Sequence, residues 1–147
     1  MKSKLLAFLL ACTGQLAFAH SGVELGPNGG RILELSKNET LHGEVTVQNG
    51  KFHLALLDKN MKPLAPAEHS ISVTVGDRAK PEKLAVQKAG DHFVFPLVKD
   101  GQWVIVQMRE DAKAKPITAR FEYDPSPCEK CKAPEWLCKC APAKEKK

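Results

Sequence analysis

Apolar and polar residues alternate along most of this chain, and that alternation restricts its fold more than any other feature. It runs from Gly22 to Tyr123, where no long stretch keeps a helical period. Successive side chains on a strand point to opposite faces, so this pattern indicates half-buried strands. Gly, Pro and Asp turns between them predict an all-β, antiparallel sandwich of about seven to eight short strands. The expected strands lie at 31–35, 45–47, 52–56, 71–75, 84–86, 93–95, 103–108 and 117–123.

The dipeptide Asn49-Gly50 is the strongest local signal within this pattern. A two-residue hairpin turn needs positive φ at both positions, which Asn and Gly tolerate. The turn would pair Gln48 with Lys51, Thr46 with His53, and His42 with Leu57, with the polar residues on an outer face. His42 and His53 would then lie about 13 Å apart at ~3.3 Å per residue, too far to bind one ion. His53 and Glu44 would form an exposed polar pair.

Two further expectations concern the core. The stretch from Trp103 to Met108 is almost continuously apolar, which favours a strand buried on both faces. Trp103, together with Phe93, Phe95 and Phe121, is expected to pack inside the sandwich.

The N-terminus has the features of an export signal. Met1-Lys2-Ser3-Lys4 precedes an apolar run and the small-residue site Ala17-Phe18-Ala19, which predicts cleavage before His20. A lipobox-like sequence ending at Cys12 is the alternative, and it would anchor a lipidated chain. The expected organisation is a signal peptide at 1–19, a β-sandwich domain at 20–124 and a cysteine-rich tail at 125–147. No later segment has the roughly 20 apolar residues of a membrane span, so a periplasmic or secreted protein is expected.

The net charge of +5 is unevenly distributed. The expected domain and the start of the tail, residues 20–127, carry 14 basic and 14 acidic residues, whereas residues 128–147 carry six Lys against three Glu. Few aromatic residues lie among those lysines, so nucleic-acid binding is not indicated.

The tail contains four cysteines, in a C-x2-C and a C-x-C pair with six residues between them: Cys128, Cys131, Cys138 and Cys140. Four thiolates can bind one soft ion, so the spacing predicts a Zn or Cu site. Neighbouring Lys130, Lys132 and Lys139 are expected to lower the thiol pKa values. The spacer is shorter than in a zinc ribbon. Two disulfides are the main alternative in an exported chain, and a thioredoxin-like redox pair is a minor one because the strand-to-helix context is missing.

Prolines 125 and 127 should stiffen the exit from the last strand and hold the tail away from the sandwich. Without metal or disulfides, the tail could be disordered. His20, if it is the first mature residue, could bind Cu(II) through its amine and imidazole. His69 and His92 fall in or beside loops and are expected to be solvated, without a partner.

The turn Leu25-Gly26-Pro27-Asn28-Gly29-Gly30-Arg31-Ile32-Leu33, followed by strands and then Lys62-Pro63-Leu64-Ala65-Pro66, resembles a known module. It is similar to the small N-terminal β-domain of periplasmic adaptor subunits of heavy-metal efflux systems of the cobalt-zinc-cadmium type, over roughly residues 23–124. The resemblance implies an envelope location and a metal-efflux partner. Members of that family commonly carry His where Asn28 stands, and the adaptor's long hairpin and barrel regions have no counterpart here. From the residues alone, the turn is expected to be structural, with positive φ at Gly29 and Gly30.

Together these observations predict an exported, non-enzymatic soft-metal-binding accessory protein that works beside an envelope efflux pump. The alternative is a disulfide-stapled module that docks onto an envelope partner. No catalytic residue can be named from the spacing of Ser, His, Asp or Glu.

Overall fold

The computed structural model describes residues 23–76 and 79–140. The predicted signal peptide at 1–19, its Cys12, and the candidate metal ligand His20 lie outside the described residues.

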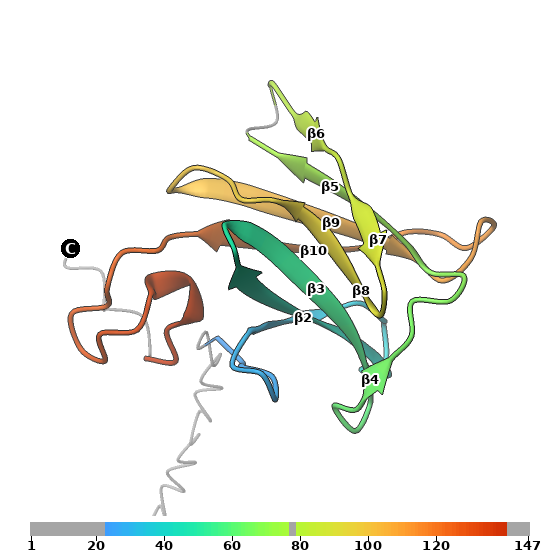
Figure 1. Ribbon diagram of the computed structural model, residues 1–147, viewed down its shortest axis with the longest axis horizontal. Helices are drawn as coiled ribbons and strands as arrows, with labels where there is room; N and C mark the ends of the chain where they lie inside the picture. The colour runs from blue at the N-terminus through green and yellow to red at the C-terminus, as the bar shows by residue number, and fades with distance from the viewer. Residues whose placement is uncertain (1–22, 77–78, 141–147) are drawn as a thin grey trace, which may run out of the picture.

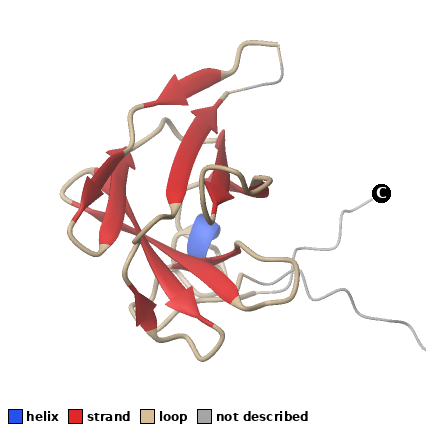
Figure 2. Ribbon diagram, turned by 90° about the vertical axis from the view of Figure 1, so that its right-hand side faces the viewer, coloured by secondary structure: helices blue, strands red, loops and turns tan. Residues whose placement is uncertain are grey.

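The described chain forms two antiparallel sheets, which confirms the predicted all-β sandwich (Figures 1 and 2). The first sheet has the order β1-β2-β3-β8-β7, with β4 paired to β3, and the second has the order β10-β9-β5-β6. The strands are β1 (Arg31–Glu34), β2 (Leu41–Gln48), β3 (Lys51–Asp58), β4 (Pro63–Leu64), β5 (Ser70–Val75), β6 (Glu82–Leu84), β7 (Gln87–Ala89), β8 (His92–Pro96), β9 (Gln102–Arg109) and β10 (Ile117–Tyr123).

The hairpin between β2 and β3 has the predicted turn and register. Asn49 and Gly50 adopt φ of 51° and 69°, as a tight two-residue turn requires. The ladder pairs Gln48 with Lys51, Thr46 with His53, and His42 with Leu57. Local turn chemistry therefore sets the position of every side chain on this hairpin.

The prediction that the polar residues of β2 face solvent is wrong for His42 and Glu44, although Gln48 is exposed. His42 and Glu44 are buried, with relative exposures of 6% and 1%. The segment that precedes β1 covers this face of β2, and the Glu44 carboxylate accepts hydrogen bonds from Asn28 N, Asn28 Nδ2 and Gly30 N at 2.8, 2.8 and 2.9 Å. His42 Nδ1 lies 3.2 Å from a Glu34 carboxylate oxygen, without hydrogen-bonding geometry.

The turn at 26–30 is structural, as expected, but one detail differs. Gly29 has φ of 75°, whereas Gly30 does not adopt positive φ. Gly30 is needed for close packing instead, because a Cβ there would lie 2.5 Å from the Val45 carbonyl oxygen. Asn28 and Gly30 both donate to Glu44, so the turn is fastened to β2.

The interior of the sandwich is built from the inward faces of both sheets. Phe93, Phe95 and Phe121 are buried as predicted. Phe52 lies among them, with its ring centre 5.2 Å from that of Phe95 and 5.7 Å from that of Phe121. Trp103 does not join them and is 45% exposed, with the Arg120 guanidinium 5.6 Å from its ring centre.

The expectation that β9 is buried on both faces is also wrong. Its buried residues alternate, at Val104, Val106 and Met108. The second sheet packs against the first on one face only, so the residues between them point outward. An apolar run alone cannot distinguish this case from a fully buried strand.

The single strand expected at 84–86 is two strands in different sheets. β6 ends at Leu84 and pairs with β5, whereas β7 begins at Gln87 and pairs with β8. Leu84 and Val86 both pack against the core. The chain thus crosses from one sheet to the other at this point and keeps both apolar side chains inside.

Candidate metal centre

The first part of the tail packs against the sandwich, so the prediction that it is held away is wrong for residues 125–140. A short 3-10 helix, η1 (Glu135–Leu137), carries Trp136, which is only 5% exposed and belongs to the core cluster. Its ring is stacked on Phe121, with 5.9 Å between the ring centres, and meets Phe52 edge-on at 6.0 Å. Burial of one large aromatic side chain outweighs the separation that prolines 125 and 127 were expected to impose.

Hydrogen bonds fix the backbone on both sides of Trp136. Trp136 N donates to the Asp124 carbonyl at 3.0 Å. Its own carbonyl accepts from Arg31 Nη1 at 2.9 Å. Val23 N donates to the Cys138 carbonyl at 3.3 Å. The tail therefore forms hydrogen bonds with the end of β10, with β1 and with the segment before β1. These bonds fix the position of the backbone at Cys138.

A tight loop positions the first cysteine pair. Cys128 N donates to the Ala133 carbonyl at 2.8 Å, and the Cys128 carbonyl accepts from Lys132 N at 2.9 Å. Lys132 adopts a left-handed φ of 64°, which lets the chain reverse immediately after Cys131. Because the loop closes on itself, Cys128 and Cys131 are held on one side of it, facing the second pair.

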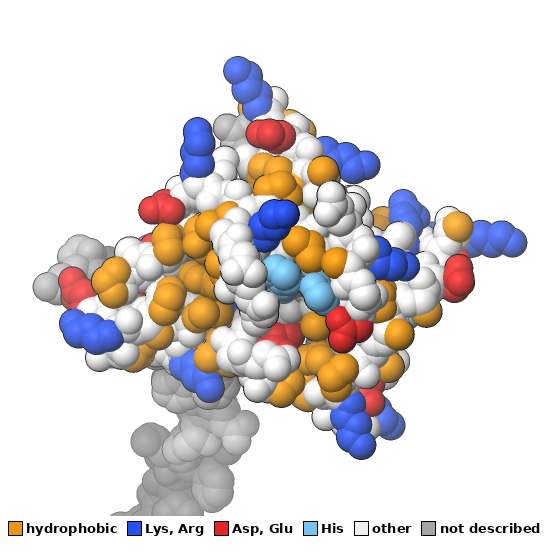
Figure 3. Space-filling view, in the orientation of Figure 1, with side chains coloured by type: hydrophobic (Ala, Val, Ile, Leu, Met, Phe, Trp, Pro, Cys, Tyr) orange, Lys and Arg blue, Asp and Glu red, His pale blue; other side chains and the backbone are white. Residues whose placement is uncertain are grey.

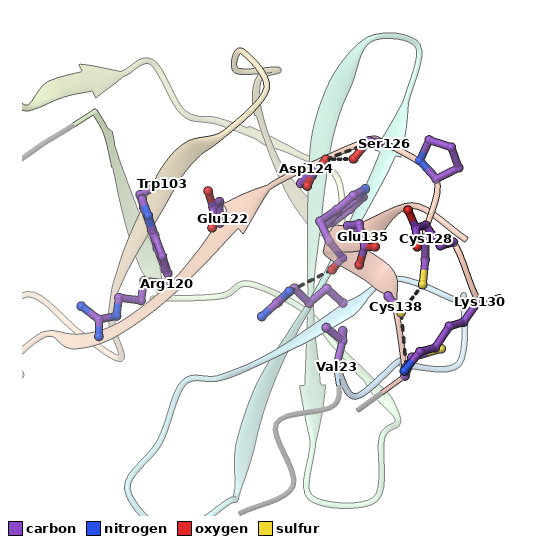
Figure 4. A pocket seen from close by; sticks show the side chains of 15 residues that line it. Val23, Trp103, Arg120, Glu122, Asp124, Ser126, Cys128, Lys130, Glu135 and Cys138 are labelled. Atoms are coloured by element: carbon purple, nitrogen blue, oxygen red, sulfur yellow. Dashed lines mark hydrogen bonds between the residues drawn. The ribbon is translucent and has the colours of Figure 1, made fainter. Parts of the chain in front are cut away.

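The four thiols meet at one point (Figure 4). The sulfur atoms all lie within 4.8 Å of one another. Cys138 Sγ is 3.3 Å from Cys128 Sγ and 3.6 Å from Cys131 Sγ. A tetrahedral zinc ion with Zn–S bonds of about 2.3 Å separates its sulfurs by about 3.8 Å. The sulfurs are therefore about as close together as a single four-coordinate ion requires, and the cluster could hold a metal ion.

None of the four cysteines is in a disulfide. The sulfurs of Cys138 and Cys128 are separated by 3.3 Å, compared with about 2.05 Å in a disulfide bond. The arrangement is that of neighbouring thiols that share hydrogen bonds.

The cluster has unequal acidities before any ion binds. Hydrogen bonds from the Cys131 backbone, the Cys138 side chain and the Lys130 backbone lower the pKa of Cys128. Hydrogen bonding to Cys128 raises the pKa of Cys138 to about 12. Cys128 is thus more acidic than Cys138, whose thiol donates a hydrogen bond to it. Backbone amides lower the pKa of Cys128, rather than the lysine charges that the sequence suggested.

The cluster opens onto a groove of about 890 Å³. In Figure 4 the groove extends from Cys128, Cys138 and Lys130 at one end to Trp103 and Arg120 at the other. Cys128 and Cys138 are buried, whereas Cys131 is exposed and Cys140 is intermediate. Two of the four potential ligands are therefore buried, and the other two are partly or fully accessible to solvent.

The described histidines do not join this centre. Contrary to expectation, His69 is not without a partner, because its Nδ1 lies 3.1 Å from the Pro66 carbonyl oxygen in its own loop. His53 and Glu44 do not form the expected exposed pair, because Glu44 is buried against the 26–30 turn.

His92 does have a partner, which contradicts the expectation that it lies alone. Its ring centre is 5.0 Å from that of His53, and the Asp91 carboxylate is 2.8 Å from its Nδ1. Partial burial and then the neighbouring His92 lower the pKa of His53. Sequence reasoning missed this pair because the two residues lie 39 positions apart and meet only through the pairing of β3 with β8.

Comparisons of the chain with protein-family models, with curated proteins and with solved structures gave no match. The resemblance to the adaptor β-domain therefore stays a prediction. Among residues 23–76 and 79–140, no helix has the length and apolar character needed to cross a membrane.

Proposed function

We propose that this chain is an exported, non-enzymatic protein that binds one zinc or copper ion through Cys128, Cys131, Cys138 and Cys140. It would sequester, deliver or sense heavy metal beside an envelope efflux system. The observation that carries the proposal is the convergence of four thiols within 4.8 Å on a segment anchored to the core.

The choice of metal follows from the ligands. Four sulfurs within 4.8 Å of one another suit Zn²⁺ or Cu(I), and they suit hard ions such as Mg²⁺ or Ca²⁺ poorly. When bound, the ion would replace the thiol protons and the hydrogen bond between Cys138 and Cys128.

A role in exchange, rather than a purely structural one, is supported by the exposure pattern. Four protein ligands fill every coordination position of a zinc ion, as in structural sites, so exchange requires that one of the ligands can be reached from solvent. Here Cys131 is exposed and Cys140 is half-buried, and both the cluster and its groove open to solvent. An incoming thiol or imidazole from a partner could therefore displace the outer ligands first while Cys128 and Cys138 keep hold of the ion.

The proposal is tested by native mass spectrometry of the mature chain purified from the exported fraction. We expect one zinc or copper ion per chain, displaced by acid or by a strong chelator. A mass lower by four hydrogens, without metal, would instead show two disulfides and favour the docking-module alternative.

The ligand assignment predicts that the double variant Cys138→Ser, Cys140→Ser loses the ion, because two of four sulfurs are removed. The matched control is Lys139→Ser, which places the same residue between the two cysteines and leaves all four thiols in place. Metal content is measured by elemental analysis. Equal metal content in the double variant and the control would refute the four-cysteine site.

The predicted export step has its own test. Sequencing the N-terminus of the chain recovered from the exported fraction should begin at His20. A lipidated N-terminal Cys12 would replace this assignment with an anchored protein.

A further inference from the structure

A second group of potential ligands lies on the outer face of the first sheet, away from the four cysteines. His53 lies opposite Val94 in the ladder between β3 and β8, and Ala55 lies opposite His92. Residues two apart on a strand share a face, so His53 and His92 are diagonal neighbours on one surface. Phe52, next to His53, points into the core instead. Figure 3 shows two histidine side chains adjacent to each other on this face.

The separation of the two rings fits joint binding of one ion. Their centres are 5.0 Å apart and their planes differ by 32°. Metal–nitrogen bonds of about 2.0–2.1 Å place each ring centre roughly 3.2 Å from the ion, and hence the two centres about 4.5–5.2 Å apart for right-angled to tetrahedral geometry. The observed distance lies within that range, so it is compatible with both rings binding one ion.

Asp91 contacts one ring nitrogen of His92, as a carboxylate often does for the non-coordinating nitrogen of a metal-binding histidine. Its Oδ1 lies 2.8 Å from His92 Nδ1. A histidine that donates one ring N–H to a carboxylate keeps its orientation and offers the other nitrogen to the metal. His92 Nε2 would therefore be the ligand atom.

Both histidines are held by regular structure. His53 lies on β3, which has β2 on one side and β8 on the other, and His92 begins β8 directly after the Gly90-Asp91 turn. Side chains on paired strands keep a fixed separation better than side chains on loops. Because the two rings are already held near each other, less conformational entropy is lost when an ion binds.

We propose that His53 and His92 form a second metal site, which takes a borderline divalent ion such as Zn²⁺, Ni²⁺ or Cu²⁺, with Asp91 as the positioning residue. Imidazole ligands select these ions over Ca²⁺ and Mg²⁺. Water completes the coordination, so the site is weaker and exchanges faster than the four-cysteine centre. It shares no residue with that centre, and the inference does not depend on the proposed function.

The test is a zinc titration of the full mature chain, followed by NMR of the histidine ring protons. Beyond one equivalent of zinc, the His53 and His92 signals should shift together and saturably, and those of His69 should not. His53→Gln and His92→Gln should each weaken this second binding at least tenfold, whereas the control His69→Gln should leave it unchanged. Asp91→Asn should weaken it by about tenfold to hundredfold while leaving the ring-proton shifts at saturation in place.

Two results would overturn the proposal. One is a titration in which the His53 and His92 signals stay fixed while zinc is added in excess. The other is a second ion that binds equally well to His53→Gln, because that ion must lie elsewhere in the chain. If the cysteines bound no zinc, the histidine signals would still be readable from the first equivalent, so failure of the cysteine site and failure of the histidine site are distinguishable.

Discussion

At the scale of single residues, Glu44 shows how a charged side chain can be buried at low cost. Its carboxylate accepts three hydrogen bonds from the 26–30 turn and is 1% exposed. Charge-assisted bonds of this kind offset the loss of hydration when every acceptor is used. Glu44 therefore acts as the fastening between the N-terminal segment and β2.

Glu44→Ala is expected to lower the free energy of unfolding by about 3 kcal/mol, because it leaves buried N–H donors of Asn28 and Gly30 without an acceptor. Glu44→Gln should cost less, since its amide oxygen can still accept. Urea denaturation measures both, with Glu82→Ala, an exposed glutamate on β6, as the control. Equal stability of Glu44→Ala and the control would contradict this role.

Features of single residues can be predicted from the sequence where interactions with near neighbours in the chain determine them. The Asn49-Gly50 turn sets its own register, so the pairing of Thr46 with His53 could be predicted. The burial of Glu44 could not, because it depends on a segment 14 to 16 residues earlier folding over β2. Likewise, Trp103 has the apolar character of a core residue, and only the position of β9 in the second sheet turns it outward.

At the scale of elements, η1 is the link between the fold and the cysteines. The sequence predicts the four ligands from their spacing, but it does not predict their anchor. Trp136 is a single aromatic residue between Pro134 and Cys138, without any periodic pattern around it. Only its contacts with Phe121 and Phe52 show that it belongs to the core.

Trp136→Ala should therefore weaken both stability and metal binding. Loss of a buried Trp is expected to cost about 3–5 kcal/mol in the free energy of unfolding. Metal affinity should fall as well, because binding would then have to order the tail. Trp103→Ala is the matched control, expected to cost about 1 kcal/mol or less at an exposed site. Denaturation and a competitive zinc titration measure the two effects, and unchanged zinc affinity in Trp136→Ala would show that the anchor does not organise the site.

At the scale of the whole molecule, the tail joins the two sheets at one end of the sandwich. It leaves β10 of the second sheet, and its carbonyls accept from Arg31 on β1 of the first sheet and from Val23. In Figure 1 the tail and the segment before β1 lie on the same end of the molecule. An ion bound by the cysteines would thus strengthen a connection between chain segments more than 100 residues apart.

Zinc should accordingly stabilise the entire sandwich. At a free concentration a thousandfold above Kd, an ion that binds only the folded chain adds about 4 kcal/mol to the free energy of unfolding. Urea denaturation in zinc buffers measures this gain, which should be largely lost in the Cys138→Ser, Cys140→Ser variant, because that variant keeps only the weaker His53–His92 site. A gain of equal size in that variant would mean that the stabilising ion binds elsewhere.

The different surroundings of the two tryptophans have one more consequence. Trp136 is buried near the cysteines and contacts three aromatic rings, whereas Trp103 is 45% exposed. Indole emission shifts to shorter wavelength in an apolar environment, so the two side chains should fluoresce at different wavelengths. In a Trp103→Phe variant, the fluorescence of Trp136 would therefore report the binding and release of an ion without any added dye.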